Sequence, residues 1–287
     1  MYTTYQNLYK QLTNIYPLNE AKAIVRMVLE DRFGLTLADI YTDKVTQLSA
    51  DDASKLKKIM LRLAKGEPVQ YVLGSVTFCG RQFGVAPGVL IPRPETELLC
   101  EWVINIHDKP YCALQPPTPL RVLDVGTGSG CIAITLSLDM PNTVVSACDI
   151  SPEALLIARD NAIRLGAAVN FQLKDALQLA ATEETFDIIV SNPPYICDSE
   201  RTEMMQNVLD HEPPTALFVP DDDPLRFYRA IAEYGTTALS HGGELYFEIN
   251  DRFADEVSAM LNALGYAGTE VRTDQFGKQR FVKTIRA

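Results

Sequence analysis

Short apolar segments alternate with helical patterns through most of the chain after residue 120. Strand-like segments occupy residues 120–125, 144–149, 169–173, 186–191 and 244–249, and helical spacing fills 131–138, 151–165, 224–240 and 252–264. This alternation is typical of a parallel sheet with helices on both faces. Residues 268–272 and 281–285 are too close for a helical crossover, so we expect that last pair to be antiparallel. The sequence therefore predicts a doubly wound α/β fold.

The first part of the chain lacks this alternation and predicts a small helical bundle. Apolar residues recur at helical spacing at 8, 12 and 15, Asn19 is a candidate cap for a helix ending at Gly34, and Ser49 is a candidate cap for a helix ending at Gly66. From residue 72 to 89 the apolar period shortens towards two, which predicts a hairpin. We therefore expect a helical substrate-recognition domain at 1–70, a β-hairpin linker at 71–92 and a larger α/β domain at 93–287.

Composition argues against several classes of protein. The chain has 287 residues and a formal net charge of −11, whereas nucleic-acid binding requires clustered Lys and Arg. The six cysteines form no C-x-x-C pair and the three histidines are far apart, so we expect no metal site and no disulfide framework. With no basic-apolar leader and no long apolar run, we expect a cytoplasmic protein without membrane contact. Nothing in the sequence indicates the oligomeric state, and a monomer is the default expectation.

A glycine-rich loop follows the strand at 120–125. Its sequence is Gly126-Thr127-Gly128-Ser129-Gly130. Glycines permit a tight turn and allow backbone amides to approach a ligand closely. The last glycine comes one residue too early for G-x-G-x-x-G, which argues against a dinucleotide. The loop predicts a site for a nucleotide-like cofactor.

Three acidic residues lie at the ends of successive predicted strands. Asp149 comes about 20 residues after the glycine loop, where a carboxylate accepts hydrogen bonds from ribose hydroxyls. Asp175 and Ala176 are placed near an adenine pocket, and Asp124 near the cationic end of the ligand. Open α/β sheets bind ligands at the carboxyl ends of their strands, where all three acids lie. The alternative is that these acids occupy ordinary turns exposed to solvent.

The strand at 186–191 leads directly into Asn192-Pro193-Pro194-Tyr195. Proline restricts the backbone and cannot donate a hydrogen bond, so this loop has a preset shape rich in acceptors. A substrate NH₂ group would donate to the Asn192 side-chain oxygen and the Pro193 carbonyl, while the Tyr195 ring stacks on the planar group. An amide nitrogen is barely basic, so orientation matters more than general-base strength. The pattern predicts group transfer to a planar nitrogen; the alternative is a turn that merely ends a strand.

With these segments in place, the chain resembles the S-adenosylmethionine-dependent methyltransferases that modify planar nitrogens. The N-P-P-Y loop occurs in enzymes acting on adenine, guanine and glutamine, so it indicates the chemistry and not the substrate. Further segments resemble the peptide chain release factor glutamine methyltransferases, the HemK/PrmC family: Gly66-Glu67-Pro68-Val69-Gln70-Tyr71, Ile91-Pro92-Arg93-Pro94-Glu95-Thr96-Glu97 and Glu212-Pro213-Pro214-Thr215-Ala216-Leu217. The resemblance runs from about residue 66 to the C-terminus. A related family acting on a ribosomal protein has a differently spelled proline-arginine segment and ranks second.

The resemblance implies a Rossmann-like class I methyltransferase domain that uses S-adenosylmethionine and no metal. The implied substrate is the glutamine of the Gly-Gly-Gln loop in class 1 release factors, methylated at N5. The implied cofactor contacts are Asp124, Gly126, Thr127, Gly128, Ser129, Gly130, Asp149, Asp175, Ala176 and Asn192. Asn192, Pro193 and Tyr195 are the expected catalytic residues, and Pro194 and Arg93 join them in binding substrate. Two positions depart from the family: Ala176 stands where relatives often have an aromatic residue, and Asn250 where they commonly have glycine.

Several alternatives stay open at this point. Arg93, Glu95 and Glu97 either shape the mouth of the substrate site or cap a helix and form an ion pair. Arg280 is expected to close the C-terminal hairpin, and the alternative is a contact with the substrate. A methyltransferase acting on a flipped-out nucleobase would use the same loop, but it requires a basic groove. A cofactor-binding adaptor without chemistry is disfavoured because the N-P-P-Y loop is intact.

Overall fold

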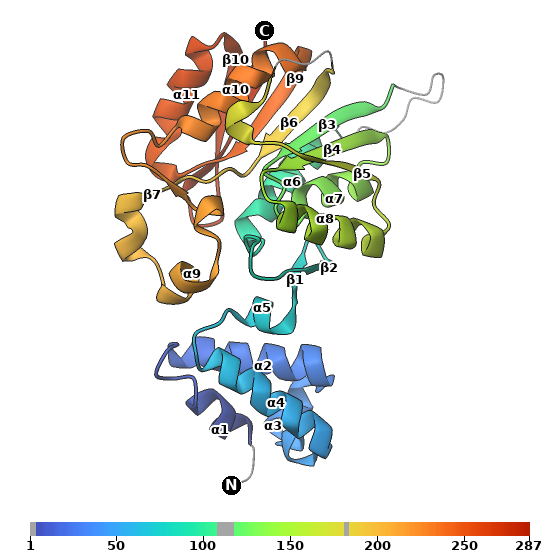
Figure 1. The fold of residues 1–287 in the computed structure, drawn as a ribbon, viewed down its shortest axis with the longest axis vertical. Coiled ribbons are helices and arrows are strands. Elements are labelled where there is room, and N and C mark those ends of the chain that lie inside the picture. The colour runs from blue at the N-terminus through green and yellow to red at the C-terminus, as the bar shows by residue number, and fades with distance from the viewer. Residues whose placement is uncertain (1–3, 108–117, 181–183) are drawn as a thin grey trace. The chain divides into compact units, whose positions relative to one another are not determined.

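A computed structural model describes residues 4–107, 118–180 and 184–287. The chain divides into two compact units, one formed by Met1–Ser75 with Met205–His211 and the other by Val76–Met204 with Glu212–Ala287. Figure 1 shows the order of the elements along the chain. No helix within the described ranges is long and apolar enough to cross a membrane.

The first unit is helical, as predicted. Its helices are α1 (Tyr5–Lys10), α2 (Leu18–Phe33), α3 (Leu37–Tyr41), α4 (Ala50–Leu63), α5 (Val69–Leu73) and α9 (Gln206–His211). Helix α2 ends at Gly34, whose φ of 63° is in the left-handed region that glycine tolerates best. The Ser49 hydroxyl accepts a hydrogen bond from the Asp52 amide at the start of α4. The apolar faces of these helices pack into one core, which includes Leu12, Leu29 and Leu63.

Three local expectations for this unit were wrong. Helix α2 begins after Pro17, so Asn19 lies inside the first turn and does not cap it. Ile15 lies beyond the end of α1 and is exposed. Val72, expected at the start of a strand-like segment, belongs to the short helix α5. Because a five-residue helix spans little more than one turn, its apolar pattern is too short to distinguish a period of 3.6 from a period of two.

Strands β1 (Ser75–Phe78) and β2 (Arg81–Gly84) form the predicted hairpin. Both residues of the connecting turn, Cys79 and Gly80, have positive φ values of 45° and 70°. This pairing is typical of the two-residue turns whose twist matches a hairpin. The Cys79 amide also donates to the Glu97 carboxylate at 3.0 Å, which ties the turn to the helix that follows.

The second unit contains a seven-stranded sheet in the order β10-β11-β9-β6-β3-β4-β5. Its strands are β3 (Leu120–Val125), β4 (Thr143–Asp149), β5 (Val169–Leu173), β6 (Phe186–Ser191), β9 (Leu239–Glu248), β10 (Tyr266–Thr273) and β11 (Gln279–Arg286). Strands β5, β4, β3, β6 and β9 run parallel, whereas β11 is antiparallel to both of its neighbours. The predicted α/β fold and the antiparallel final pair are confirmed. The two-residue strands β7 (Ile196–Cys197) and β8 (Phe218–Val219) pair separately.

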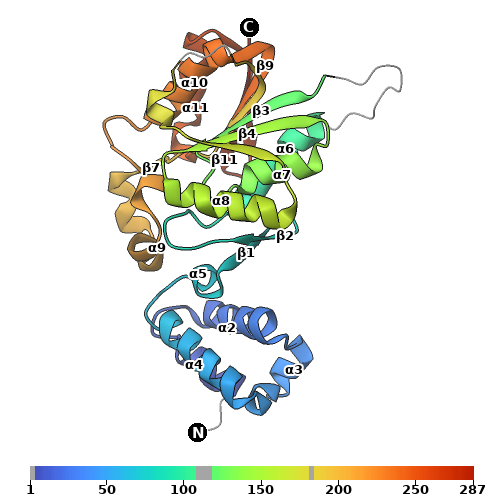
Figure 2. The ribbon, with the colours of Figure 1, turned by 45° about the vertical axis from the view of Figure 1, so that its right-hand side comes forward.

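Helices cover both faces of this sheet. Helices α6 (Pro94–His107), α7 (Cys131–Asp139) and α8 (Pro152–Leu165) lie on one face, and α10 (Arg226–Ala238) and α11 (Ala254–Ala263) on the other (Figure 1 and Figure 2). Neighbouring residues of a strand point to opposite faces. Val122 accordingly belongs to the core beneath α6 and α7, and Leu123 to the core beneath α10 and α11.

The strand order reverses between β3 and β6. The chain leaves β3 for β4 on one side and returns to β6 on the other. Val125 and Ser191, the last residues of β3 and β6, are paired, and the Ser191 hydroxyl donates to the Val125 carbonyl at 2.6 Å. The glycine loop and the Asn-Pro-Pro-Tyr loop therefore begin side by side at the switch point, where open α/β sheets bind their ligands.

Candidate active site

A cavity of about 320 Å³ opens at this edge of the sheet. Of the predicted site residues, eight line it: Gly126, Gly128, Asp149, Asp175, Ala176, Asn192, Pro193 and Pro194. The remaining predicted residues, Asp124, Thr127, Ser129, Gly130, Tyr195 and Arg93, are not in the cavity wall as the structure describes it. One cavity therefore brings together residues of the glycine loop and of the Asn192-Pro193-Pro194-Tyr195 loop (the transfer loop). Several other predicted residues lie behind the cavity surface.

The glycine loop leaves open space where side chains would otherwise project. Gly126 and Gly128 have φ values of 77° and 54°, and a Cβ added to either would meet no described atom within 4 Å. Both line the cavity. Their missing side chains thus give a ligand access to the backbone, as the sequence predicted.

Asp149, at the end of β4, accepts two backbone hydrogen bonds. Its Oδ2 accepts from the Gly128 amide at 2.8 Å and its Oδ1 from the Ser151 amide at 2.9 Å. Burial raises the pKa of this carboxyl, opposed by those backbone donors. A carboxylate oxygen has more than one acceptor site, so Asp149 both shapes the loop and keeps acceptor capacity towards the cavity.

Asp124 is fully buried behind the loop. Its Oδ2 accepts from the Thr127 hydroxyl at 2.6 Å and from the Ala133 amide at 3.2 Å. No described residue donates to its Oδ1. Burial raises the pKa of Asp124 to about 7. The carboxyl therefore holds the loop to α7 and has an acceptor left over beside a ligand site.

Gly130 supports the loop by packing, and this gives a testable prediction. A Cβ on Gly130 would lie 2.9 Å from Ile134 Cδ1 and 3.2 Å from Ala158 Cβ, whereas the same atom on Gly166 meets nothing within 4 Å. The φ values of the two glycines, 82° and 76°, are similar. We expect Gly130→Ala to lower the free energy of unfolding by about 1–2 kcal/mol more than Gly166→Ala. Urea unfolding of both variants measures the difference; equal losses would show that backbone strain alone matters.

The adenine side of the predicted site combines polar and apolar groups. Asp175 caps the turn that begins at Ala176, accepting from the Leu177 amide at 2.9 Å. Ile150 is 60% exposed and lines the cavity. The sequence analysis missed Ile150, although its position directly after a strand-ending aspartate was a usable signal. It also missed Phe227 on α10, for which no local signal exists.

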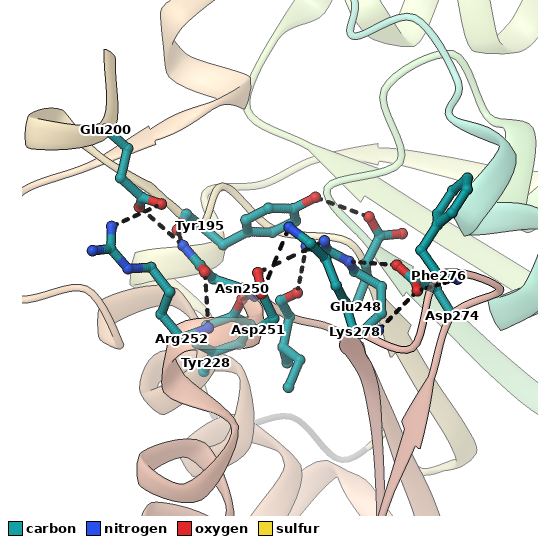
Figure 3. A network of polar contacts seen from close by, with 12 residues as sticks. Tyr195, Glu200, Tyr228, Glu248, Asn250, Asp251, Arg252, Asp274, Phe276 and Lys278 are labelled. Carbon is teal, nitrogen blue, oxygen red and sulfur yellow. Dashed lines mark hydrogen bonds and ion pairs between the residues drawn. The ribbon is translucent and has the colours of Figure 1, made fainter. Parts of the chain in front are cut away.

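Hydrogen bonds between side chains hold the transfer loop in place. Asn192 Nδ2 donates to the Thr96 hydroxyl at 3.1 Å, and that hydroxyl donates to Glu248 Oε2 at 2.7 Å. The Tyr195 hydroxyl donates to Glu248 Oε1 at 3.0 Å (Figure 3). Thr96 and Glu248 are both buried. Sequence reasoning assigned no role to Thr96 or Glu248; that Tyr195 stacks on the substrate stays a prediction.

Asn250 fits its position, where the family resemblance led us to expect glycine. Its φ of −70° is open to any residue. Its Nδ2 donates to the Tyr195 carbonyl and to Glu200, both at 3.0 Å, and its Oδ1 accepts from the Arg252 amide at 3.1 Å (Figure 3). The asparagine thus secures the end of the transfer loop.

Arg93 forms an ion pair with a buried acid. It donates to Glu212 Oε1 at 2.6 Å, and Glu212 Oε2 accepts from the Ile91 amide at 3.1 Å. The flanking residues Leu90 and Pro213 line the cavity. Of the two alternatives for Arg93, this geometry supports the ion pair, which links the two segments of the cavity wall that contain Leu90 and Pro213. A contact between Arg93 and the substrate stays a prediction.

Arg280 lies beside the turn between the last two strands. Arg280 donates to the Ile249 carbonyl at 3.3 Å and lies 3.6 Å from Asp274, in the turn between β10 and β11. This placement agrees with the expected closing of the hairpin. Within the described part of the chain, no group of three or more His, Cys, Asp or Glu side chains is arranged to hold a metal ion.

Comparison with known proteins assigns the family. Residues 112–217 match the model of the methyltransferase small domain, and residues 5–74 match that of the PrmC N-terminal domain. The chain is 47% identical to the release factor glutamine methyltransferase of Bacteroides thetaiotaomicron over 96% of its own length and 97% of the relative's. The chain belongs to the release factor glutamine methyltransferase family. The family's protein in Flavobacterium psychrophilum is 39% identical over 95% of this chain and 94% of that one.

Solved structures confirm the fold of the second unit. A methyltransferase from Pyrococcus furiosus superposes with a TM-score of 0.52, covering 83% of this chain and all of that one at 16% identity. A 16S rRNA N2 G1207 methyltransferase from T. thermophilus, solved with AdoMet and guanosine, also has a TM-score of 0.52, covering 74% of this chain and 50% of that one at 16% identity. The Rossmann-like class I methyltransferase fold is therefore shown for this family member.

Proposed function

We propose that this protein transfers a methyl group from S-adenosylmethionine to the N5 amide nitrogen of the glutamine in the Gly-Gly-Gln loop of class 1 peptide chain release factors. One observation carries the proposal: the glycine loop and the Asn192 loop meet in a single cavity at the switch point of the sheet. Family membership supports the substrate, since the relatives are named release factor glutamine methyltransferases.

The residues present fit S-adenosylmethionine. Gly126 and Gly128 leave room for a ligand against the backbone, Asp149 has acceptor capacity for ribose hydroxyls, and the unpartnered Oδ1 of Asp124 suits an ammonium group near the loop. We propose that Asp175, Ala176 and the exposed Ile150 form the adenine end. When bound, the cofactor supplies an electrophilic methyl group on a positively charged sulfur.

The transfer loop supplies orientation. The Asn192 side-chain oxygen and the Pro193 carbonyl are proposed to accept both hydrogens of the substrate NH₂, which directs the nitrogen lone pair at the methyl group. Positioning of this kind lowers the barrier without a strong base. Thr127, Ser129 and Gly130 shape the cofactor loop from behind the cavity wall, and we propose no metal.

The charge of the chain supports a protein substrate over a nucleobase. A nucleobase enzyme needs a basic groove along the phosphates, and the net charge here is −11. The relatives are named for release factors, so we propose a release factor as the substrate ahead of a ribosomal protein. We propose a cytoplasmic monomer with three parts: a helical substrate-recognition domain at 1–70, a hairpin linker at 71–92 and a catalytic domain at 93–287.

Competition between substrate classes tests the proposal. The purified protein is incubated with methyl-labelled S-adenosylmethionine and, separately, with a class 1 release factor, total ribosomal protein and transfer RNA. We expect label in the release factor alone. Label confined to ribosomal protein or RNA would overturn the substrate assignment while leaving the fold unaffected.

A further inference from the structure

The side-chain amide of Asn192 can face the cavity in two ways, and only one of them suits the proposed reaction. An asparagine amide has an acceptor oxygen at one end and a donor NH₂ at the other. A substrate NH₂ requires the acceptor end. A reversed amide would set donor against donor and lose the hydrogen bond. Something in the fold must therefore fix the orientation.

Two hydrogen bonds form a row that links Asn192 to Thr96 and Thr96 to Glu248, three residues from distant parts of the chain. Thr96 comes from the first turn of α6, Asn192 follows β6, and Glu248 ends β9. The Thr96 hydroxyl lies 3.1 Å from Asn192 Nδ2 and 2.7 Å from Glu248 Oε2. Thr96 is 2% exposed and Glu248 is 1% exposed, so solvent does not compete for these contacts.

The direction of donation along this row is determined by the carboxylate. Glu248 receives two hydroxyl donors. Thr96 donates to Oε2, and Tyr195 donates to Oε1 (Figure 3). A hydroxyl has a single hydrogen, and Thr96 gives its hydrogen to Glu248. The Thr96 oxygen is left only as an acceptor, so Asn192 must present Nδ2 to it. The Oδ1 end of the amide is then the one available to a substrate.

We propose that Glu248 and Thr96 are positioning residues whose hydrogen-bond polarity holds the Asn192 amide with its oxygen towards the substrate nitrogen. The inference rests on the proposed function and deepens it, because it assigns two further residues to the same site. Neither residue touches the cavity; both act through Asn192. An ionised Glu248 imposes the correct polarity. A protonated Glu248 can donate to Thr96 and free the Thr96 hydrogen for Asn192 Oδ1, which reverses the row.

The charged and polar groups around Glu248 determine the pH at which this reversal occurs. The groups facing it are Glu95 and Thr96 on α6, Tyr195 after β6, Tyr228 on α10 and Arg280 on β11. Burial raises the pKa of Glu248 above its ordinary value, and the hydroxyl donors and Arg280 oppose the shift. The ionised form is the working one, so turnover should fall as pH decreases through that raised pKa.

Four variants test the proposal. Thr96→Val removes the hydroxyl and keeps the shape, Thr96→Ser keeps the hydroxyl, and Glu248→Gln introduces a donor without changing size. Thr135→Val is the matched control: Thr135 is a buried threonine on α7, and its hydroxyl contacts no described hydrogen-bond partner. For release factor methylation we expect kcat to fall about 10- to 100-fold in Thr96→Val and Glu248→Gln. Thr96→Ser should stay within a few-fold of wild type, and Thr135→Val should match wild type.

Two further measurements separate positioning from general structure. The affinity for S-adenosylmethionine, measured by calorimetry, should stay within about twofold in all four variants, since the cofactor loop is untouched. The acid limb of the kcat profile should be present in the wild type and absent in Glu248→Gln. Wild-type turnover in Thr96→Val, equal losses in Thr96→Ser and Thr96→Val, or a parallel loss of cofactor affinity would overturn the proposal.

A readout that needs no substrate keeps this inference distinct from the proposed function. The side-chain amide resonance of Asn192 is assigned by its disappearance in Asn192→Ala. We expect one of its protons to exchange slowly with solvent in the wild type and Thr96→Ser, and rapidly in Thr96→Val. Fast exchange in the wild type would refute the positioning row. Slow exchange together with no methyl transfer to any release factor would refute only the proposed function.

Discussion

Replacing Asn192 with alanine is expected to lower kcat for methyl transfer by about 10²- to 10³-fold, the loss typical of removing one preorganised hydrogen-bonding group from a transfer site. Asn192 lines the cavity and is held by Thr96. Its side-chain oxygen acts on the substrate nitrogen, so the affinity for S-adenosylmethionine should change less than about threefold. Single-turnover rates and calorimetric titration of the cofactor measure the two quantities separately.

A matched control for this variant is Asn170→Ala. Asn170 is an exposed asparagine on β5 that lies outside the cavity, so its removal should leave both quantities unchanged. Turnover of Asn192→Ala close to that of the wild type would contradict the role given to the transfer loop. A large loss of cofactor affinity would instead place Asn192 mainly in the cofactor site.

Asp149→Ala is expected to weaken S-adenosylmethionine binding by about 10- to 100-fold. Hydrogen bonds to a charged group contribute roughly 1.5–3 kcal/mol each, and one or two are lost with this carboxylate. The variant also releases the Gly128 amide, which Asp149 holds at 2.8 Å, so the glycine loop loses its fixed shape. Equilibrium binding of the cofactor, without any protein substrate, measures the effect.

Asp187→Ala serves as the control for this second variant. Asp187 lies near the opposite end of the sheet, on β6, where its carboxylate accepts from the Arg121 amide at 2.9 Å. It therefore loses the same kind of contact far from the cavity. If Asp187→Ala weakened cofactor binding as much as Asp149→Ala does, a general loosening of the sheet would explain both losses. That result would contradict the proposal that Asp149 binds the ribose.

The sheet and the two loops were predictable because their signals are local. Apolar runs with turn residues at their ends defined the strands, and the positions of Gly126 and Gly128 required a backbone that glycine alone adopts easily. The spacing between residues 272 and 281 was too short for a crossover, which predicted the antiparallel pair. In each case neighbouring residues contain the whole pattern.

The supporting contacts were not predictable because their partners are far apart in sequence. Thr96 and Glu248 meet across 152 positions, and Arg93 and Glu212 across 119. No periodicity relates such pairs; the sheet order creates them. The hydrogen bond from the Tyr195 hydroxyl to Glu248 likewise spans 53 positions.

Peptide mass spectrometry of a methylated release factor tests the central claim most directly. The protein is mixed with S-adenosylmethionine and a class 1 release factor, either wild type or with the glutamine of Gly-Gly-Gln changed to alanine. The account predicts one added methyl group on the side-chain nitrogen of that glutamine, and none in the altered factor. A methyl group at another residue, or the same yield from both factors, would contradict it.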